Sequence, residues 1–291
     1  MLFQRILTAC ILAAVVISAV FLLPTLYFYL FIAIIVLIAG WEWTGLSETD
    51  GIADKLLFQI GLILPMLFVT FWTHILEITA EIFEYPEIKN FSGALEWLVI
   101  GPVLYWIMMM FLIRNVSDEL LKINLKNSYQ LFIGWFVLIS AWMFLTKLRA
   151  YYGPEAVMYF LLLIWVADIA AYFSGKKFGK DKLAPSISPG KTVQGMYGAI
   201  LSAVICAVIL ILYYGYPLLM STDFILLSIL TVLVSIYGDL FFSLVKRRKG
   251  VKDSGFILPG HGGLLDRIDS VIAAAPFYYA GVILIGRSVF S

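Results

Sequence analysis

The chain has 291 residues, of which 62% are hydrophobic and 13% are charged, and its formal net charge is +1. Soluble globular domains are about 45–50% apolar and about 25% charged, so this composition excludes an ordinary soluble domain. Both cysteines, Cys10 and Cys206, lie inside apolar runs, which argues against a disulfide framework or a cysteine-ligated metal site. The sequence therefore predicts an integral membrane protein.

Nine apolar runs are each close to the roughly 20 residues that a helix needs to cross a bilayer. In chain order they cover residues 6–23, 26–43, 56–73, 95–113, 129–147, 155–174, 193–214, 224–244 and 269–286. Without a long linker or an internal repeat, we expect one all-α, polytopic membrane domain over residues 1–291. Its N-terminal helices are expected to reach about residue 150, and its catalytic helices and cytoplasmic loops to begin at about residue 151.

The basic residues set the orientation of these runs. With nine spans and a cytoplasmic N-terminus, 16 of the 20 Lys and Arg residues fall on the inner side, as the positive-inside rule requires. The outer segment 74–94 is acidic and is expected to be an interfacial helix. The inner loop near 46–55 is the exception, because it is acidic rather than basic.

Five carboxylates then fall at the inner ends of the runs: Glu42, Asp168, Asp239, Asp266 and Asp269. Ionisable groups in spans are costly and usually face a bundle interior, a cavity or a partner. Asp239 with the Asp266 and Asp269 pair offers hard oxygen ligands suited to Mg²⁺. Simpler readings stay open: Asp266 and Asp269 can complement a helix N-terminus, and Glu42, between two tryptophans, is equally an interfacial anchor.

Two polar loops accompany these acids. Segment 243–269 carries a basic cluster and a glycine group at 259–263, whose backbone suits close approach to an anion. His261 alone is a weak signal, because a structural histidine is commoner. In segment 174–195, Lys191 and Thr192 open the next helix and can hold a phosphate there. The other four lysines of that loop are explained by the positive-inside rule.

The same residues resemble a known family. Segment 243–269 is similar to the signature of phosphatidate cytidylyltransferases (CDP-diacylglycerol synthases) at Ser243, Lys246, Arg247, Lys252, Asp253, Gly255, Pro259, His261, Gly262, Gly263, Asp266, Arg267 and Asp269. A second segment resembles the family at 165–168, 171–172, Gly175 and 188–192, and 41–43 does so more loosely. One departure is Gln194, where the family usually has Glu, and its effect on activity stays open.

The resemblance implies transfer of CMP from CTP to phosphatidic acid, giving CDP-diacylglycerol and pyrophosphate. It implies Mg²⁺, leaves a second, monovalent cation and a homodimer open, and implies no nucleic-acid partner. The expected place is the bacterial inner membrane, with the site on the cytoplasmic side of the lipid bilayer. The expected catalytic residues are Asp168, Lys246, Arg247, Lys252, Asp253, His261 and Arg267. The expected substrate-binding residues are Ser188, Lys191, Thr192, Ser243, Gly262 and Gly263, and the expected metal ligands are Asp239, Asp266 and Asp269.

Two alternatives remain. An ion-coupled transporter also places carboxylates in its spans, but its site usually lies near the bilayer midplane, whereas the acids here gather at one face. Another lipid-phosphate transferase, such as a CDP-alcohol phosphatidyltransferase, is disfavoured because the sequence has no D-x-x-D-G aspartate motif of that kind.

Overall fold

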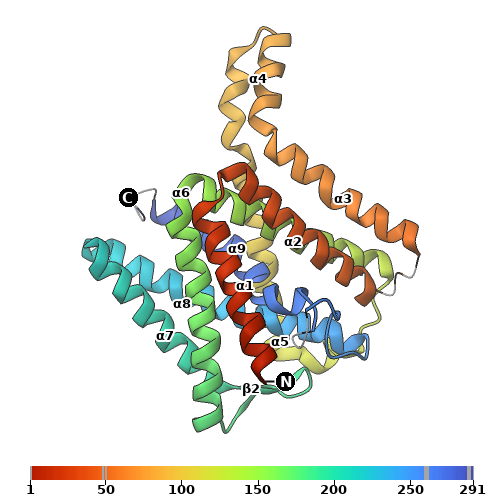
Figure 1. Cartoon of the computed structure of the whole chain (residues 1–291), viewed down its shortest axis with the longest axis vertical. Helices are drawn as coiled ribbons and strands as arrows, with labels where there is room; N and C mark the ends of the chain where they lie inside the picture. The colour runs from red at the N-terminus through yellow and green to blue at the C-terminus, as the bar shows by residue number, and fades with distance from the viewer. Residues whose placement is uncertain (1, 48, 50, 259–261, 287–289, 291) are drawn as a thin grey trace.

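The fold is built almost entirely from helices (Figure 1). The computed structural model describes residues 2–47, 49, 51–258, 262–286 and 290, with side chains from residue 8 onward. The elements are α1 (Leu2–Leu22), α2 (Thr25–Leu46), α3 (Ile52–Thr70), α4 (Trp72–Ile82), the 3-10 helix η1 (Pro86–Val99), α5 (Ile100–Lys122), α6 (Asn127–Phe178), β1 (Lys182–Ala184), β2 (Ser188–Thr192), α7 (Val193–Tyr214), α8 (Leu218–Arg248) and α9 (Leu265–Ile285).

Within the described residues, seven helices are long and apolar enough to cross a membrane: α2, α3, η1 continued by α5, α6, α7, α8 and α9. This agrees with the predicted all-α, polytopic class. Helix α6 has 52 residues and contains two predicted runs, which meet at Gly153. The φ of 81° at Gly153 breaks the helix just before Pro154. The described apolar part of α1, Thr8–Leu22, is shorter than the other spans.

Within this all-α fold, residues 182–192 form a short antiparallel hairpin of β1 and β2 where only a loop was expected. Lys182 pairs with Thr192, and Ala184 pairs with Ser188. Thr192 is also the N-cap of α7, since its Oγ1 accepts a hydrogen bond from the Gly195 N–H at 3.1 Å. This cap satisfies one of the free N–H groups at the helix start, so the change from strand to helix is fixed at Thr192.

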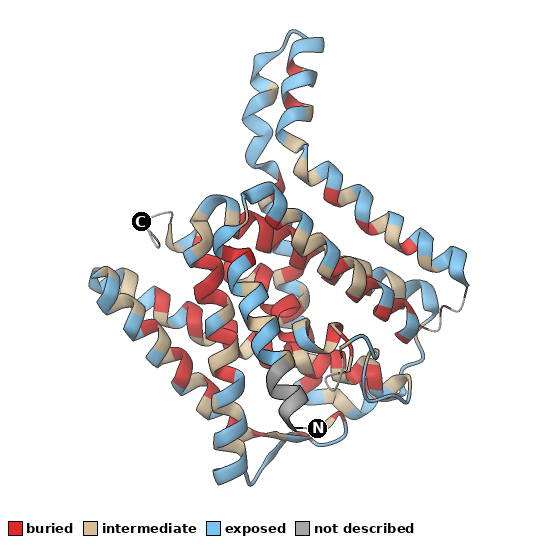
Figure 2. Ribbon diagram, viewed as in Figure 1, coloured by how far each residue is buried: buried red, intermediate tan, exposed pale blue. Residues whose placement is uncertain are grey.

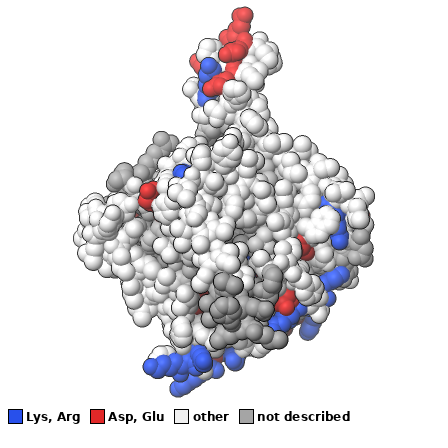
Figure 3. Space-filling model, viewed as in Figure 1, with Lys and Arg blue, Asp and Glu red and all other residues white. Residues whose placement is uncertain are grey.

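The acidic segment 74–94 is helical, as expected, and forms α4 and η1, which project from the body as a narrow hairpin (Figure 1). Figure 3 shows carboxylates at the tip of this projection, while Lys and Arg gather at the opposite end of the molecule, near the β-hairpin. The two ends of the molecule therefore differ in charge. The interfacial location of this segment stays a prediction.

Helices α6, α8 and α9 form the centre of the molecule, and their buried faces meet there (Figure 2). In the most apolar window of α8, 67% of residues are buried inside the protein, against 17% in α3 and 28% in α7. Helices that are apolar all round and exposed are typical of membrane spans. The carboxylates of α8 and α9 therefore lie on the central helices, and α3 and α7 present apolar faces outward.

The C-terminal end of α2 is fixed against α6 by one aromatic side chain. Trp43 is 1% exposed, and its indole Nε1 donates a hydrogen bond to the Gln130 carbonyl at 3.0 Å. The ring occupies the space that a Cβ at Gly134 would need. Because only glycine allows this approach, the end of α2 cannot move far along α6.

Candidate active site

A cavity of about 420 Å³ opens between the end of α6, the β-hairpin, the start of α7 and the middle of α8. Four predicted site residues line it: Asp168, Lys191, Thr192 and Asp239. Its volume is within the range of about 300–1,000 Å³ that is usual for small-molecule sites. These four residues, which are far apart in the sequence, thus line one concave site.

Lys191 and Asp239 form an ion pair inside this cavity, with Nζ and Oδ2 2.6 Å apart. Lys191 Nζ also donates to the Ile236 carbonyl at 3.2 Å, and Ser243 Oγ donates to the other oxygen of Asp239 at 3.3 Å. The Asp168 carboxylate interacts electrostatically with both members of the pair and with Arg267. The β-hairpin therefore presents a lysine to an aspartate of α8, and the lysine is held at the cavity wall.

Asp266 and Lys246 form a second, more buried pair, with Oδ1 and Nζ 2.5 Å apart and side chains 5% and 11% exposed. The other oxygen of Asp266 accepts hydrogen bonds from the backbone N–H groups of Ser254, at 2.8 Å, and Gly263, at 3.1 Å. Both oxygens of Asp266 are thus occupied, one by Lys246 of α8 and the other by the loop between α8 and α9. Glycine is favoured at Gly262 because its φ is 83°.

Asp269 is buried, and its Oδ1 accepts a hydrogen bond from the Ser270 N–H at 2.8 Å. Its carboxylate is close enough to Asp239 for mutual repulsion, and it is attracted by Lys246 and Lys191. A positive charge between two such carboxylates would relieve that repulsion.

In the part of the chain that the structure describes, which leaves out His261, no three Asp, Glu, His or Cys side chains are grouped as a metal site. The predicted three-aspartate cluster is therefore not formed among these residues. The metal role of Asp239, Asp266 and Asp269 stays a prediction.

The remaining predicted residues are spread around this centre. Arg247 joins the turn of the β-hairpin to the loop between α8 and α9. Its Nε donates to the Ile187 carbonyl and its Nη1 to the Val251 carbonyl, both at 3.3 Å. Ser188 lies in β2 and does not line the cavity. Lys252, Asp253 and Arg267 are exposed, Gly263 is buried, and His261 lies outside the described residues.

Three further side chains gain a role that sequence reasoning missed or left open. Lys176 and Lys182 line the cavity, although the positive-inside rule had been enough to explain them. Lys182 reaches the cavity through the strand register, which pairs it with Thr192 and which the sequence reasoning did not predict. Glu42 is 5% exposed and hydrogen-bonded to the loop before α9, so the interfacial-anchor reading is wrong.

Gln194, the departure from the family pattern, holds the start of the hairpin. Its Oε1 accepts from the backbone N–H groups of Lys180 and Asp181 at 3.0 and 3.2 Å, and its Nε2 donates to Asp181 Oδ2 at 2.7 Å. A glutamate here would keep the two backbone contacts but would set a second carboxylate against Asp181. The amide is thus matched to its neighbour.

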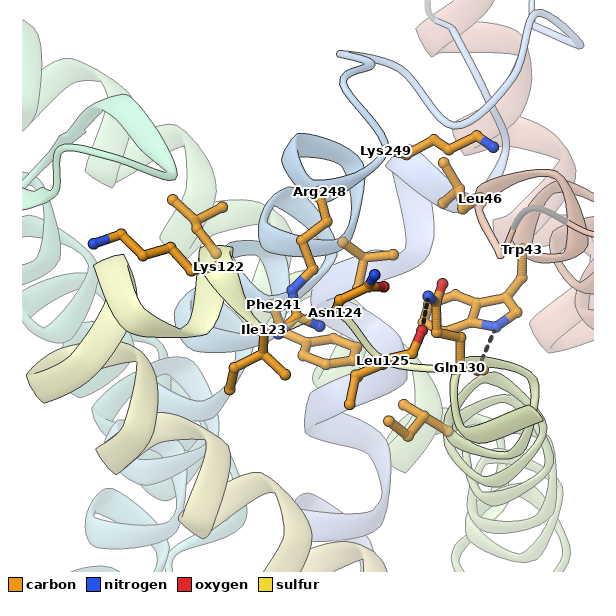
Figure 4. Close-up of a pocket in the computed structure, with 13 residues that line it drawn as sticks. Trp43, Leu46, Lys122, Ile123, Asn124, Leu125, Gln130, Phe241, Arg248 and Lys249 are labelled. Carbon is orange, nitrogen blue, oxygen red and sulfur yellow. Dashed lines mark hydrogen bonds between the residues drawn. The ribbon is translucent and has the colours of Figure 1, made fainter. Parts of the chain in front are cut away.

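A second cavity, of about 290 Å³, lies on the opposite face of α8 (Figure 4). Trp43 and Phe241 line it, and so does Arg248, whose guanidinium donates to the Leu120 carbonyl at 2.9 Å through Nε and 2.5 Å through Nη2. Figure 4 shows the amines of Lys122 and Lys249 pointing outward, away from the cavity and from each other. The basic side chains of this second cavity do not point toward one another. The first cavity is therefore the better candidate for a polyanionic substrate.

Comparison with known proteins identifies the family of the chain. The model of the cytidylyltransferase family matches residues 3–285. The chain belongs to the cytidylyltransferase family. A Haemophilus influenzae protein named phosphatidate cytidylyltransferase is 35% identical over 288 residues, which cover 96% of this chain and 97% of the relative. A Pseudomonas aeruginosa protein of the same name is 34% identical over 281 residues, covering 96% of each.

A third relative, from Bacillus subtilis and also named phosphatidate cytidylyltransferase, has a higher identity over a shorter part of the chain. It is 46% identical over 131 residues, covering 44% of this chain and 47% of the relative. The family membership of this cytidylyltransferase therefore rests on the full-length matches.

Proposed function

We infer that this protein is a nucleotidyltransferase that transfers CMP from CTP to phosphatidate, releasing pyrophosphate and forming CDP-diacylglycerol for phospholipid synthesis. The observation that carries this function is the match over 96% of the chain to relatives named phosphatidate cytidylyltransferase. The cavity supports it, because three lysines, Lys176, Lys182 and Lys191, line a space of suitable volume for a polyphosphate.

The attacking group in this reaction is an oxygen of the lipid phosphate, which is already ionised near neutral pH. It forms a bond to the α-phosphorus of CTP as the bond to the pyrophosphate oxygen breaks. A strong general base is unnecessary, and catalysis depends on positioning and charge neutralisation. In our proposal Lys191, Lys246 and Arg247 supply positive charge around the phosphates, with Lys252 and Arg267 at the exposed edge.

Other predicted residues take supporting roles in the proposal. Ser243 and Thr192 offer hydroxyl groups beside the phosphates, and the backbone of Gly262 and Gly263 approaches one phosphate group. Asp168 orients Lys191 or Arg267, with which it interacts. Ser188, Asp253 and His261 are proposed on the family resemblance alone.

The residues present fit a magnesium ion. Asp239 and Asp269 are carboxylates close enough to repel each other, and Mg²⁺ commonly takes one or two carboxylates together with substrate phosphates. When bound, the ion would neutralise phosphate charge. Asp266 can serve as a third ligand only by giving up Lys246 or its backbone donors. A second, monovalent cation is proposed with Asp168 as its available carboxylate.

We propose nine membrane spans with a cytoplasmic N-terminus, in the bacterial inner membrane, and an active site on the cytoplasmic side. The gathering of Lys and Arg at the end that carries the β-hairpin supports this orientation (Figure 3). A homodimer is proposed as well, and light scattering of the detergent-solubilised protein would test it.

The test of the function is an assay of pyrophosphate release by the purified protein with CTP, phosphatidate and Mg²⁺. Release that requires both substrates, stops with a chelator and returns with excess Mg²⁺ is expected. Ion flux in liposomes, without any CTP turnover, would instead establish the transporter alternative.

A further inference from the structure

The loop that joins α8 to α9 is held from outside the C-terminal half of the chain. Glu42, on α2, is 5% exposed and accepts three hydrogen bonds from this region. Its Oε1 accepts from the Leu264 N–H at 2.9 Å. Its Oε2 accepts from the Leu265 N–H at 2.8 Å and from the Ser254 hydroxyl at 2.9 Å. One carboxylate thus joins residues more than 200 positions away.

These contacts complete the start of α9. The first N–H groups of a helix have no partner within the helix, and Leu264, the N-cap of α9, has no capping side chain. Glu42 supplies the missing acceptor from a different helix. Its negative charge also lies at the positive end of the α9 dipole, where anions are stabilised. Among the residues that the structure describes, the carboxylate is therefore satisfied by hydrogen bonds and the helix dipole, with no ion pair to a basic side chain.

Two glycines of the loop make room for this carboxylate. A Cβ at Gly255 would lie 2.6 Å from Glu42 Oε1, and a Cβ at Gly263 would lie 2.5 Å from Oε2. Both distances are too short for real contacts. Gly255 and Gly263 thus pack directly against the Glu42 carboxylate. The Asp266 carboxylate also binds this loop, because it accepts hydrogen bonds from the Ser254 and Gly263 N–H groups.

We propose that Glu42 is a positioning residue that caps α9 from α2 and thereby holds Asp266 and Asp269 in register with Lys246. Trp43 keeps the carboxylate in place, because its ring is locked against α6 by Gln130 and Gly134. The kinetic part of this inference rests on the proposed function and on placing these groups beside the phosphates of CTP rather than the phosphate of the lipid. The structural part does not.

The test is Glu42→Gln, which keeps the size of the side chain but replaces one acceptor oxygen with an NH₂ that faces backbone donors. Hydrogen exchange of the peptide covering residues 254–265 should accelerate about ten-fold or more, as expected for losing charge-assisted hydrogen bonds. The KM for CTP should rise by a similar factor of about ten, while the KM for phosphatidate stays within about two-fold.

A second variant approaches the same contact from the loop. Gly255→Ala leaves the charge of Glu42 unchanged but places a methyl group against it, so it should give the same exchange signature. Gly45→Ala is the control, because it adds a methyl group to α2, the helix that carries Glu42, in open space with nothing within 4 Å. It should change neither loop exchange nor either KM.

The outcomes separate the positioning role from a general structural one and from failure of the proposed function. Unchanged loop exchange in Glu42→Gln would overturn the inference, and so would a lower apparent kcat with both KM values unmoved. If the wild-type protein does not turn over CTP, the proposed function fails. The exchange measurement needs no activity and still decides whether Glu42 holds the loop.

Discussion

At the scale of single residues, the three aspartates of the candidate site differ in what they already bind. Asp266 has both oxygens engaged with Lys246 and two backbone N–H groups. Asp239 also has both oxygens engaged, by the side chains of Lys191 and Ser243, but it lies at the wall of an open cavity. Asp269 is buried next to Asp239 and repelled by it. We therefore expect Asp239 and Asp269 to serve the reaction directly and Asp266 to serve it through the loop.

Asp239→Asn and Asp269→Asn should each lower turnover by about 100-fold or more, the usual cost of removing one preorganised charged group. Both should raise the Mg²⁺ concentration needed for half-maximal rate. Asp266→Asn should instead lower the free energy of unfolding by about 3 kcal/mol, because it leaves Lys246 buried without its counter-ion. Magnesium titrations and thermal melting in detergent measure the two effects.

The matched comparison is between Asp266→Asn and Asp269→Asn. If Asp266→Asn shifts the Mg²⁺ dependence as far as Asp269→Asn and leaves the melting temperature unchanged, Asp266 is a metal ligand and the division of roles is wrong.

At the scale of elements, the contact between α2 and α6 decides how accurately the site is built. Glu42 can cap α9 only if the end of α2 is fixed, and Trp43 fixes it against Gly134. This contact lies beside the second cavity, which Trp43 lines, and its residues do not line the candidate active-site cavity. The Trp43–Gly134 contact can therefore affect the site only by setting the position of α2, which carries Glu42.

Gly134→Ala should lower the free energy of unfolding by about 1–3 kcal/mol, because a methyl group would overlap the Trp43 ring in a close-packed contact. Gly101→Ala is the control, since its Cβ would meet Phe136 at an ordinary 3.8 Å. That change should be neutral or should stabilise by up to about 1 kcal/mol, the helix preference of alanine over glycine. If Gly134→Ala and Gly101→Ala lower the melting temperature equally, the close packing of Trp43 against Gly134 does not contribute the expected stability.

At the scale of the whole molecule, the separation of charge between its two ends carries the proposed orientation. The projecting α4–η1 hairpin carries the acidic tip, and the β-hairpin lies at the basic end (Figure 3). Lys and Arg are retained on the cytoplasmic side during insertion. The two hairpins should therefore lie on opposite sides of the membrane.

Single cysteines placed in a background with Cys10 and Cys206 changed to serine test this topology. Lys180→Cys, exposed before β1, should react with a membrane-impermeant maleimide only in inside-out vesicles. Glu81→Cys, exposed on α4, should react only in right-side-out vesicles or intact spheroplasts. Reaction of both positions from the same side would sink the proposed nine-span arrangement.

Much of the site could be predicted from the sequence because its signals are local. The apolar runs follow from composition, and a helical repeat puts Asp239 and Ser243 on one face of α8, where the hydroxyl does contact the carboxylate. The positions of the intramembrane acids near span ends likewise predicted that Asp168 and Asp239 lie at one membrane face, whereas the ion pair of Lys191 with Asp239 was not predicted. Each of these inferences uses only the spacing of residues along one helix or the number of basic residues in a loop.

Other features depend on contacts between distant segments and were decided only by the tertiary structure. The β-hairpin, the pairing of Asp266 with Lys246 and the capping of α9 by Glu42 each join groups whose sequence spacing carries no periodic signal. A buried carboxylate looks the same in sequence whether it binds a metal, a lysine or a helix end. Its partner is decided by side-chain positions that tertiary packing fixes to within a few ångströms. Gly255 and Gly263 allow the loop to approach Glu42, and Gly134 allows Trp43 to pack against α6.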